Sequence, residues 1–310
     1  MESLNRMAIE LVDEAIDFAE VLGTGAYELE NGATVLDFGV DFDGGVEAGL
    51  LLSEIQTGGL ATVQTNVGEL GGAPIRYVEL TTDHPDLALL CSQKAGWEVS
   101  IGEFEGLGSG PARALVGTED VFHRVGYHDA FDLTVLTVES DDLPDERVAE
   151  HVADLAEVNE ESVFLVGFRT ASIAGSVSIG ARAAELAAFR LSELGYDPTD
   201  IVSAAGKAPV APVAASEEEA MARTNDALAY GGQVHLTVRE DFDRFDEIVS
   251  TAGERYGEPF ADIYETVDWD FYELDEGVFA PAKVTVDVIG GPTHVHGETD
   301  EELLADSFDL

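Results

Sequence analysis

Three consecutive segments decide the fold class of this chain: LTVLTV (133–138), PDERVAEHVADLAE (144–157) and VFLVGF (163–168). The first and third are short apolar runs of the kind that forms strands, and the middle one is long and polar enough for a helix. Strand and helix candidates alternate in the same way along the remaining chain. This interleaving predicts an α/β protein.

The elements around that core give a coarse map of the chain. We predict a helix of about twenty residues from Ser3, a hairpin around Asn31-Gly32, a glycine-rich loop over 99–110 and a long helix over 173–194. The 310 residues are about twice the length of a typical single domain. We therefore expect two α/β regions, 1–165 and 166–310, with discontinuous domains as an open alternative.

The charge balance excludes some partners. The chain carries 63 acidic and 15 basic residues, a formal net charge of −48, and its basic residues include only three lysines. The apolar fraction of 45% is normal for a folded core. Nucleic acids and anionic membranes would be repelled. Dense carboxylates with very few lysines are typical of a protein from a salt-saturated cytoplasm, where the Debye length falls to about 3 Å. A nucleic-acid mimic is the alternative, but the acids are spread rather than blocked together.

Cysteine use and hydropathy indicate a soluble, cytoplasmic protein. Cys91 is the single cysteine, which excludes an internal disulfide and a four-cysteine zinc site. The first residues are acidic and amphipathic, without the basic start and apolar run of a signal peptide. No stretch approaches the roughly 18 uncharged apolar residues of a membrane span.

The segment GLGSGPAR (106–113) is the first candidate site. Gly108, Ser109 and Gly110 would let a ligand approach the backbone closely, and the following proline suits the first turn of a helix. Free N–H groups at that helix start, with Arg113 nearby, would favour an anion. The spacing matches neither a Walker loop nor a dinucleotide fingerprint. A tight loop before a helix explains the segment equally well, so the residues alone leave ligand binding open.

The segment ASIAGSVSIGARAAELAAF (171–189) is the second candidate. Arg182 and Glu185 are its only charged residues, and Ser178 lies on the same helical stripe. The small and apolar remainder predicts burial on most sides. One interpretation is a structural ion pair inside the core. The other is a cleft in which Glu185 acts as a general base and Arg182 tunes its charge.

Two further features are weaker candidates for a functional site. His294 and His296 lie two residues apart and could ligate zinc from one strand face, but neither a third histidine nor a cysteine is close in sequence. Lys94 is one of the three lysines and lies next to Trp97 in SQKAGW, which hints at a ligand or a specific ion pair.

Several of these runs together resemble methenyltetrahydromethanopterin cyclohydrolase. The order and spacing of the runs are the most specific part of the resemblance, which covers nearly the whole chain and thins after about residue 240. The runs are SQKAGW (92–97), GSGPARAL (108–115), SIAGSV (172–177) with ARAAE (181–185), and APVAPV (208–213). The end around His294 does not resemble the family's tail. The acidic composition makes the chain similar to a haloarchaeal member.

The resemblance implies a cytoplasmic, cofactor-free enzyme, usually a homotrimer, in which two α/β domains flank a long pocket. Such enzymes interconvert the cyclic methenyl cation on a tetrahydropterin carrier with its N5-formyl form, in one-carbon metabolism of the methanogenic type. The family's catalytic arginine and glutamate fall on Arg182 and Glu185, of which the glutamate deprotonates or orients the attacking water. The positions that we assign to binding of the pterin substrate are Lys94, Gly108, Ser109, Gly110, Arg113 and Ser178.

The chemistry of the implied reaction fits these residues. An amidinium-like carbon between two nitrogens is already electrophilic, so the reaction requires only a positioned water and a proton acceptor, without a metal. Two other classes stay open at this point: a metal-dependent hydrolase built on His294 and His296, and a ligand-binding protein without activity. The type of carrier, methanopterin or folate-like, and the direction of the reaction are not fixed by the residues.

Overall fold

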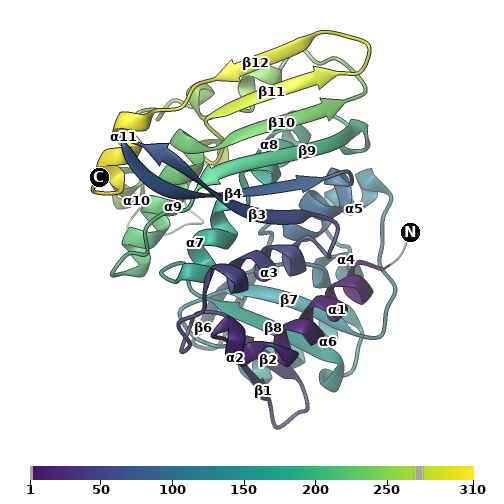
Figure 1. The fold of residues 1–310 in the computed structure, drawn as a ribbon. Helices are drawn as coiled ribbons and strands as arrows, with labels where there is room; N and C mark the ends of the chain where they lie inside the picture. The colour runs from purple at the N-terminus through teal and green to yellow at the C-terminus, as the bar shows by residue number, and fades with distance from the viewer. Residues whose placement is uncertain (1–2, 268, 270–273, 275) are drawn as a thin grey trace. The chain divides into compact units, whose positions relative to one another are not determined.

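The computed structural model describes residues 3–267, 269, 274 and 276–310, and the chain divides into two compact units. Unit 1 comprises Met1–Thr62 and Asp86–Ser178, and unit 2 comprises Val63–Pro85 and Ile179–Leu310. Each unit holds its own six-stranded sheet with helices, so the predicted α/β class is confirmed (Figure 1). The units are discontinuous because a hairpin from the first half of the chain joins the sheet of unit 2.

The sheet of unit 1 has the strand order β1-β2-β8-β7-β6-β5. Its strands are β1 (Gly25–Glu28), β2 (Thr34–Asp37), β5 (Trp97–Ile101), β6 (Phe104–Ser109), β7 (Thr134–Glu139) and β8 (Val163–Phe168). Its helices are α1 (Leu4–Asp17), α2 (Ala19–Leu22), α3 (Val46–Gln56), α4 (Ala112–Val116), α5 (Asp120–Val125), α6 (Glu146–Ala156) and α7 (Ile173–Gly180), with a π-helix η1 (Asp86–Gln93) and a 3₁₀ turn η2 (Glu160–Ser162). The predicted hairpin between β1 and β2 is confirmed.

Helices cover both faces of the central strands of unit 1. Strands β7 and β8 pair in parallel and are joined through α6, as the opening three segments predicted. Val135 and Val166 pack in one cluster with residues of α1 and α3, whereas Leu136 and Leu165 pack in another with residues of α6. Burial on both faces explains why these strands read as continuous apolar runs.

The glycine-rich segment 99–110 is a hairpin, so its prediction as a loop was wrong. Strands β5 and β6 pair antiparallel and turn at Gly102, whose φ is 68°. A Cβ atom added to Gly106 would lie 2.6 Å from Val138 Cγ1, and one added to Gly108 would lie 3.1 Å from the Trp97 carbonyl oxygen. These glycines therefore allow close packing around β6 rather than an open loop.

The helix predicted over 173–194 is interrupted. It consists of α7, a turn at Ala181 and Arg182, and α8 (Ala183–Glu193). The Arg182 N–H donates to Ile179 O at 3.0 Å, a bond that spans three residues and tightens the chain after Gly180, a poor helix former. Arg182 thereby becomes the N-cap residue of α8, and Glu185 lies in its first turn.

The sheet of unit 2 has the order β12-β11-β10-β9-β4-β3. Its strands are β3 (Thr62–Leu70), β4 (Ala73–Thr82), β9 (Ile201–Pro209), β10 (Gln233–Val238), β11 (Lys283–Val288) and β12 (Thr293–Gly297). Its helices are α8, α9 (Glu217–Gly231), α10 (Phe260–Glu265) and α11 (Glu301–Ser307), with 3₁₀ turns η3 (Pro198–Asp200), η4 (Phe245–Glu247), η5 (Ser250–Ala252) and η7 (Glu276–Val278). The Ser216 hydroxyl caps α9, and the segment after β10 includes the short turns η4 and η5.

One face of the unit 2 sheet is buried and the other is exposed. Along β10, for example, Val234 and Leu236 are buried whereas Gln233 and His235 are exposed. Helix α8 contacts both β9 and β10. Among the described residues, no helix is long and apolar enough to cross a membrane.

Candidate active site

Arg182 and Glu185 form a buried ion pair at the N-terminus of α8. Arg182 Nη1 lies 3.9 Å from Glu185 Oε2, and the two side chains are 9% and 4% exposed. A buried carboxylate is costly unless a cation compensates it, and the positive end of the helix dipole favours a carboxylate in the first turn. The separation is longer than that of a direct hydrogen bond, so this atom pair attracts by charge rather than by a tight fork.

Gly206 on β9 allows the first turn of α8 to approach the sheet. A Cβ atom at this position would lie 2.6 Å from Ala184 N and 2.9 Å from Ala184 Cβ. Ala184 lies between Arg182 and Glu185, so the glycine sets the height of the ion pair above the sheet. We did not predict a role for Gly206; its signal was a single glycine inside a strand, which often marks a close backbone approach.

Within unit 1, the Ser178 hydroxyl is hydrogen-bonded to Gln56. Ser178 Oγ donates to Gln56 Oε1 at 2.9 Å, and Ser92 Oγ donates to the Gln56 carbonyl oxygen at 2.6 Å. The Gln56 and Gln93 side chains are fully buried, yet Gln56 Nε2 and both polar atoms of Gln93 have no hydrogen-bond partner among the described residues. An ordered water or a polar ligand atom would satisfy these amides.

Arg113, Glu119 and Lys94 form one ionic cluster in unit 1. Arg113 Nε and Nη2 donate to the two Glu119 carboxylate oxygens at 2.8 and 2.7 Å, and Lys94 Nζ lies 3.4 Å from Glu119 Oε2. Arg113 also donates to the carbonyl oxygens of Ser92 and Leu90. Burial alone would raise the pKa of Glu119, but the charge and hydrogen bonds of Arg113, aided by Lys94, lower it below its usual value.

These contacts fix most of the Arg113 guanidinium inside the protein, where its side chain is 1% exposed. Lys94, at 23% exposure, keeps more contact with solvent. Glu119 was not singled out from the sequence, because one carboxylate does not stand out among 63 acidic residues. The structure therefore brings Lys94 and Arg113 together, as neighbours of one carboxylate.

The predicted glycine segment is held by internal bonds. Ser109 Oγ and Thr137 Oγ1 lie 2.8 Å apart, and the Gly110 N–H donates to Ser92 O at 2.8 Å. Gly110 adopts a φ of 103°, which favours glycine. Helix α4, which follows it, is only five residues long. Substrate binding by Gly108, Ser109 and Gly110 stays a prediction.

The histidine-rich end and the cysteine do not supply an alternative centre. His294 Nε2 lies 2.9 Å from Asp241 Oδ1, and the ring centroids of His294 and His296 lie 6.1 Å apart. In the described part of the chain, nowhere do three His, Cys, Asp or Glu side chains gather to hold a metal ion. Burial raises the pKa of the Cys91 thiol to about 12, so this group is not a thiolate nucleophile at neutral pH.

The chain is an α/β protein of two units in which a buried carboxylate is paired with an arginine at a helix start, an arrangement found both in structural cores and in sites of proton transfer. The chain belongs to the cyclohydrolase family: the family model described as Cyclohydrolase (MCH) matches residues 3–308.

Relatives support this assignment along the entire chain. A methenyltetrahydromethanopterin cyclohydrolase of Halobacterium salinarum is 61% identical over 310 residues, with all of both chains covered. Proteins of the same name from Methanosphaerula palustris and Methanosarcina mazei are 39% and 38% identical, with all of this chain and at least 99% of theirs covered. The similarity to a Halobacterium protein fits the halophilic composition.

Proposed function

We propose that this enzyme interconverts N5,N10-methenyltetrahydromethanopterin and water with N5-formyltetrahydromethanopterin. The buried Arg182–Glu185 pair at the start of α8 is the observation that carries this proposal. Family membership and the names of the full-length relatives support the choice of substrate.

In the proposed mechanism, Glu185 accepts a proton from the attacking water. The water oxygen bonds to the amidinium carbon, which becomes tetrahedral, and the positive charge on the two nitrogens is neutralised. A proton then reaches N10, and the hydroxyl group on the tetrahedral carbon loses its proton as its C=O bond forms and the bond between this carbon and N10 breaks. The carbon stays on N5 as the formyl group. The sum is one water consumed and one proton released. A positioned carboxylate is sufficient for such proton transfer, and the substrate's own positive charge makes a cofactor unnecessary.

Arg182 is the proposed positioning group for Glu185. At 3.9 Å its positive charge compensates the negative charge of the buried carboxylate, the proposed proton acceptor. A carboxylate in the site would also favour binding of the cationic substrate. The Ser178 hydroxyl is proposed to contact the substrate, and its bond to Gln56 fixes its orientation.

The ionic cluster of unit 1 is proposed to serve the carrier. Lys94 is the more exposed of its two cations and would donate to an anionic group of the carrier. Arg113 would hold Glu119 and the Ser92 carbonyl oxygen, which also accepts from the Gly110 N–H. We further propose that the enzyme works in the cytoplasm as a homotrimer.

A turnover assay tests the proposal. Decay of the methenyl absorbance should accelerate with protein in molar KCl, and should be compared for tetrahydromethanopterin and tetrahydrofolate carriers. Protein that binds the methenyl compound without hydrolysing it would instead be a ligand-binding protein. Activity that disappears with a chelator and returns with zinc would support a metal-dependent hydrolase.

A further inference from the structure

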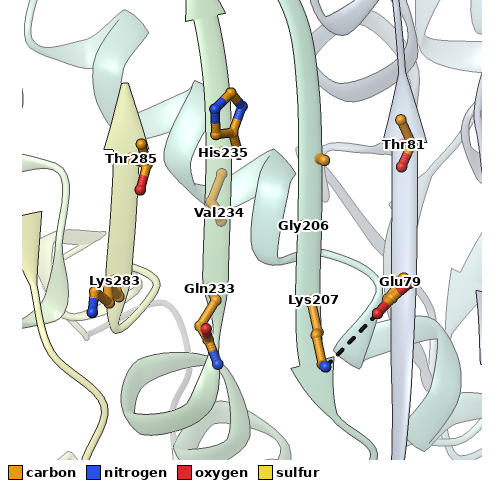
Figure 2. A pocket seen from close by; sticks show the side chains of 10 residues that line it. Glu79, Thr81, Gly206, Lys207, Gln233, Val234, His235, Lys283 and Thr285 are labelled. Carbon is orange, nitrogen blue, oxygen red and sulfur yellow. Dashed lines mark ion pairs between the residues drawn. The ribbon is translucent and has the colours of Figure 1, made fainter. Parts of the chain in front are cut away.

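The exposed face of the unit 2 sheet has a composition unlike the rest of the chain. Strand register aligns its side chains in rows across β11, β10, β9 and β4. The first row is Lys283, Gln233, Lys207 and Glu79, and the second is Thr285, His235, Ala205 and Thr81. Figure 2 shows the side chains of these two rows, except the unlabelled Ala205, on the four neighbouring strands. We call this surface, with the third-row residues Asp287, Thr237 and Ser203, the open face.

Positive charge is concentrated on the open face. Two of the chain's three lysines, Lys207 and Lys283, lie there with only two carboxylates, Glu79 and Asp287, in a chain where acids outnumber bases 63 to 15. By contrast, the start of α9 is Glu217, Glu218 and Glu219, of which Glu218 is exposed and the other two are half-buried. The open face is therefore close to neutral on a strongly acidic molecule.

The two carboxylates of the open face already have partners within it. Lys207 Nζ lies 3.8 Å from Glu79 Oε1 and 4.6 Å from the centroid of the Tyr77 ring. His235 Nε2 lies 3.0 Å from Asp287 Oδ2. For Lys283, whose side chain is exposed, the described residues include no carboxylate within ion-pair distance.

The shape of the open face also suits a partner. A hollow of about 360 Å³ lies over β11, β10, β9 and β4, bounded by Lys283, Lys207 and Glu79 and floored by Gly206. Val295 on β12, paired in register with Thr285, is a large apolar side chain that is 57% exposed. A protruding side chain of a partner could fill the hollow and cover this apolar rim.

Charge decides which surface of such a molecule can meet a second copy of itself. Two copies with a net charge of −48 repel when the salt concentration is low, and at any salt concentration unpaired carboxylates lose their hydration when they are buried. A near-neutral face whose carboxylates are already paired avoids most of this repulsion and most of the desolvation cost. Lys283, which has no ion-pair partner among the described residues, would attract the acidic surface of another copy.

We propose that the open face is the surface through which copies of this chain pack against one another. The inference rests on the proposed homotrimer and specifies its interface. Around a threefold axis each contact joins two different patches, so the open face of one copy receives an acidic segment of the next.

The test compares two substitutions that each add one negative charge. Thr285→Glu places a carboxylate on the open face, and the control Val21→Glu places one at an 83% exposed position of unit 1. Sedimentation in molar KCl should show association weakened at least tenfold for Thr285→Glu and unchanged for Val21→Glu, with the melting temperature reporting folding. Wild-type mass in a folded Thr285→Glu variant would overturn the proposal, as would a monomeric wild type.

Lysine acetylation provides a second measurement if Thr285→Glu does not fold. In the variant Val21→Lys the introduced lysine is the exposed reference, and Lys283 in the same molecule should react at least tenfold more slowly. Equal rates in assembled protein would overturn the proposal. Turnover is measured in parallel. A wild-type protein that is active as a monomer would contradict the proposed interface but not the proposed reaction. A wild-type protein that is an inactive trimer would contradict the proposed reaction but not the interface.

Discussion

At the scale of single residues, Glu185 is the side chain on which turnover should depend most. Glu185→Gln keeps the volume and hydrogen bonding of the side chain but removes its proton acceptor. We expect kcat to fall by a factor on the order of 10² to 10⁴, with KM little changed, in the methenyl absorbance assay. Glu193→Gln, at an exposed position of the same helix, is the matched control and should behave like wild type.

A structural ion pair would give a different result. In that case Glu185→Gln leaves Arg182 buried without its counter-charge, which costs about 3 to 5 kcal/mol of stability, while turnover persists. Arg182→Lys adds a second comparison, because an ammonium does not reproduce the planar guanidinium. A Glu185→Gln variant that folds and binds substrate but is inactive would assign Glu185 to catalysis rather than to a structural ion pair.

Asp226 on α9 should make stability depend on pH. Burial raises its pKa to about 6, although the Ser307 hydroxyl and the Phe260 N–H donate to it at 2.6 and 2.9 Å. The folded state therefore holds this proton more tightly than the unfolded state. The resulting stabilisation is full below about pH 4 and is lost as the pH rises through about 6.

Replacing the Asp226 carboxyl by an amide removes the free-energy cost of ionising a buried carboxyl above about pH 6. We expect Asp226→Asn to stabilise the protein at pH 7.5 by about 1 to 3 kcal/mol, and by less at pH 5, in denaturant unfolding in molar KCl. Glu218→Gln, at an exposed position of the same helix, controls for the change in net charge. An equal effect of Asp226→Asn at both pH values would contradict the assignment.

At the scale of secondary-structure elements, the contact between β9 and α8 should govern activity. Gly206→Ala forces a Cβ atom against Ala184 N and must displace the turn that carries Glu185. Because small misplacements of catalytic groups are costly, we expect kcat to drop at least tenfold, together with a lower melting temperature. Ala205→Gly changes the same strand on its other face and should retain most of the activity. Wild-type kcat in Gly206→Ala would contradict this role.

Substitution of Arg113 distinguishes a structural role of this side chain from direct contact with the carrier. Arg113→Ala leaves Glu119 without its main partner, and we expect a loss of about 2 to 4 kcal/mol in denaturant unfolding. Arg147→Ala removes an exposed fork to Asp145 and should change stability little. If Arg113 instead contacts the carrier directly, Arg113→Ala would keep its stability and raise KM alone.

The same elements show what the sequence could and could not predict. The β7-α6-β8 succession was predictable because apolar runs and an amphipathic helix alternate there. The β5–β6 hairpin was missed because its glycines, which indicate loops in isolation, accommodate neighbouring strands. Arg182 and Glu185 stood out as the only charges of a small, apolar helix. Glu119 could not be chosen because one carboxylate does not stand out among 63 acidic residues, and the role of Gly206 depends on Ala184 in the neighbouring helix.

At the scale of the whole molecule, charge and salt are coupled. The −48 charge is tolerable in molar salt, where the Debye length is about 3 Å, but at 0.1 M it grows to about 10 Å and neighbouring carboxylates repel. We therefore expect circular dichroism to show unfolding as KCl is lowered from molar concentrations to 0.1 M. An uncharged osmolyte at equal osmolarity is the control and should protect far less.

Assembly should be lost before folding as the salt is lowered. Repulsion between copies acts across their full surfaces, whereas the near-neutral open face offsets it only locally. Sedimentation should therefore show single chains at a KCl concentration where circular dichroism still reports native structure. A mass and melting temperature that stay constant down to 0.1 M KCl would mean that the carboxylates are compensated within the molecule. The acid excess would then be a feature of solubility alone.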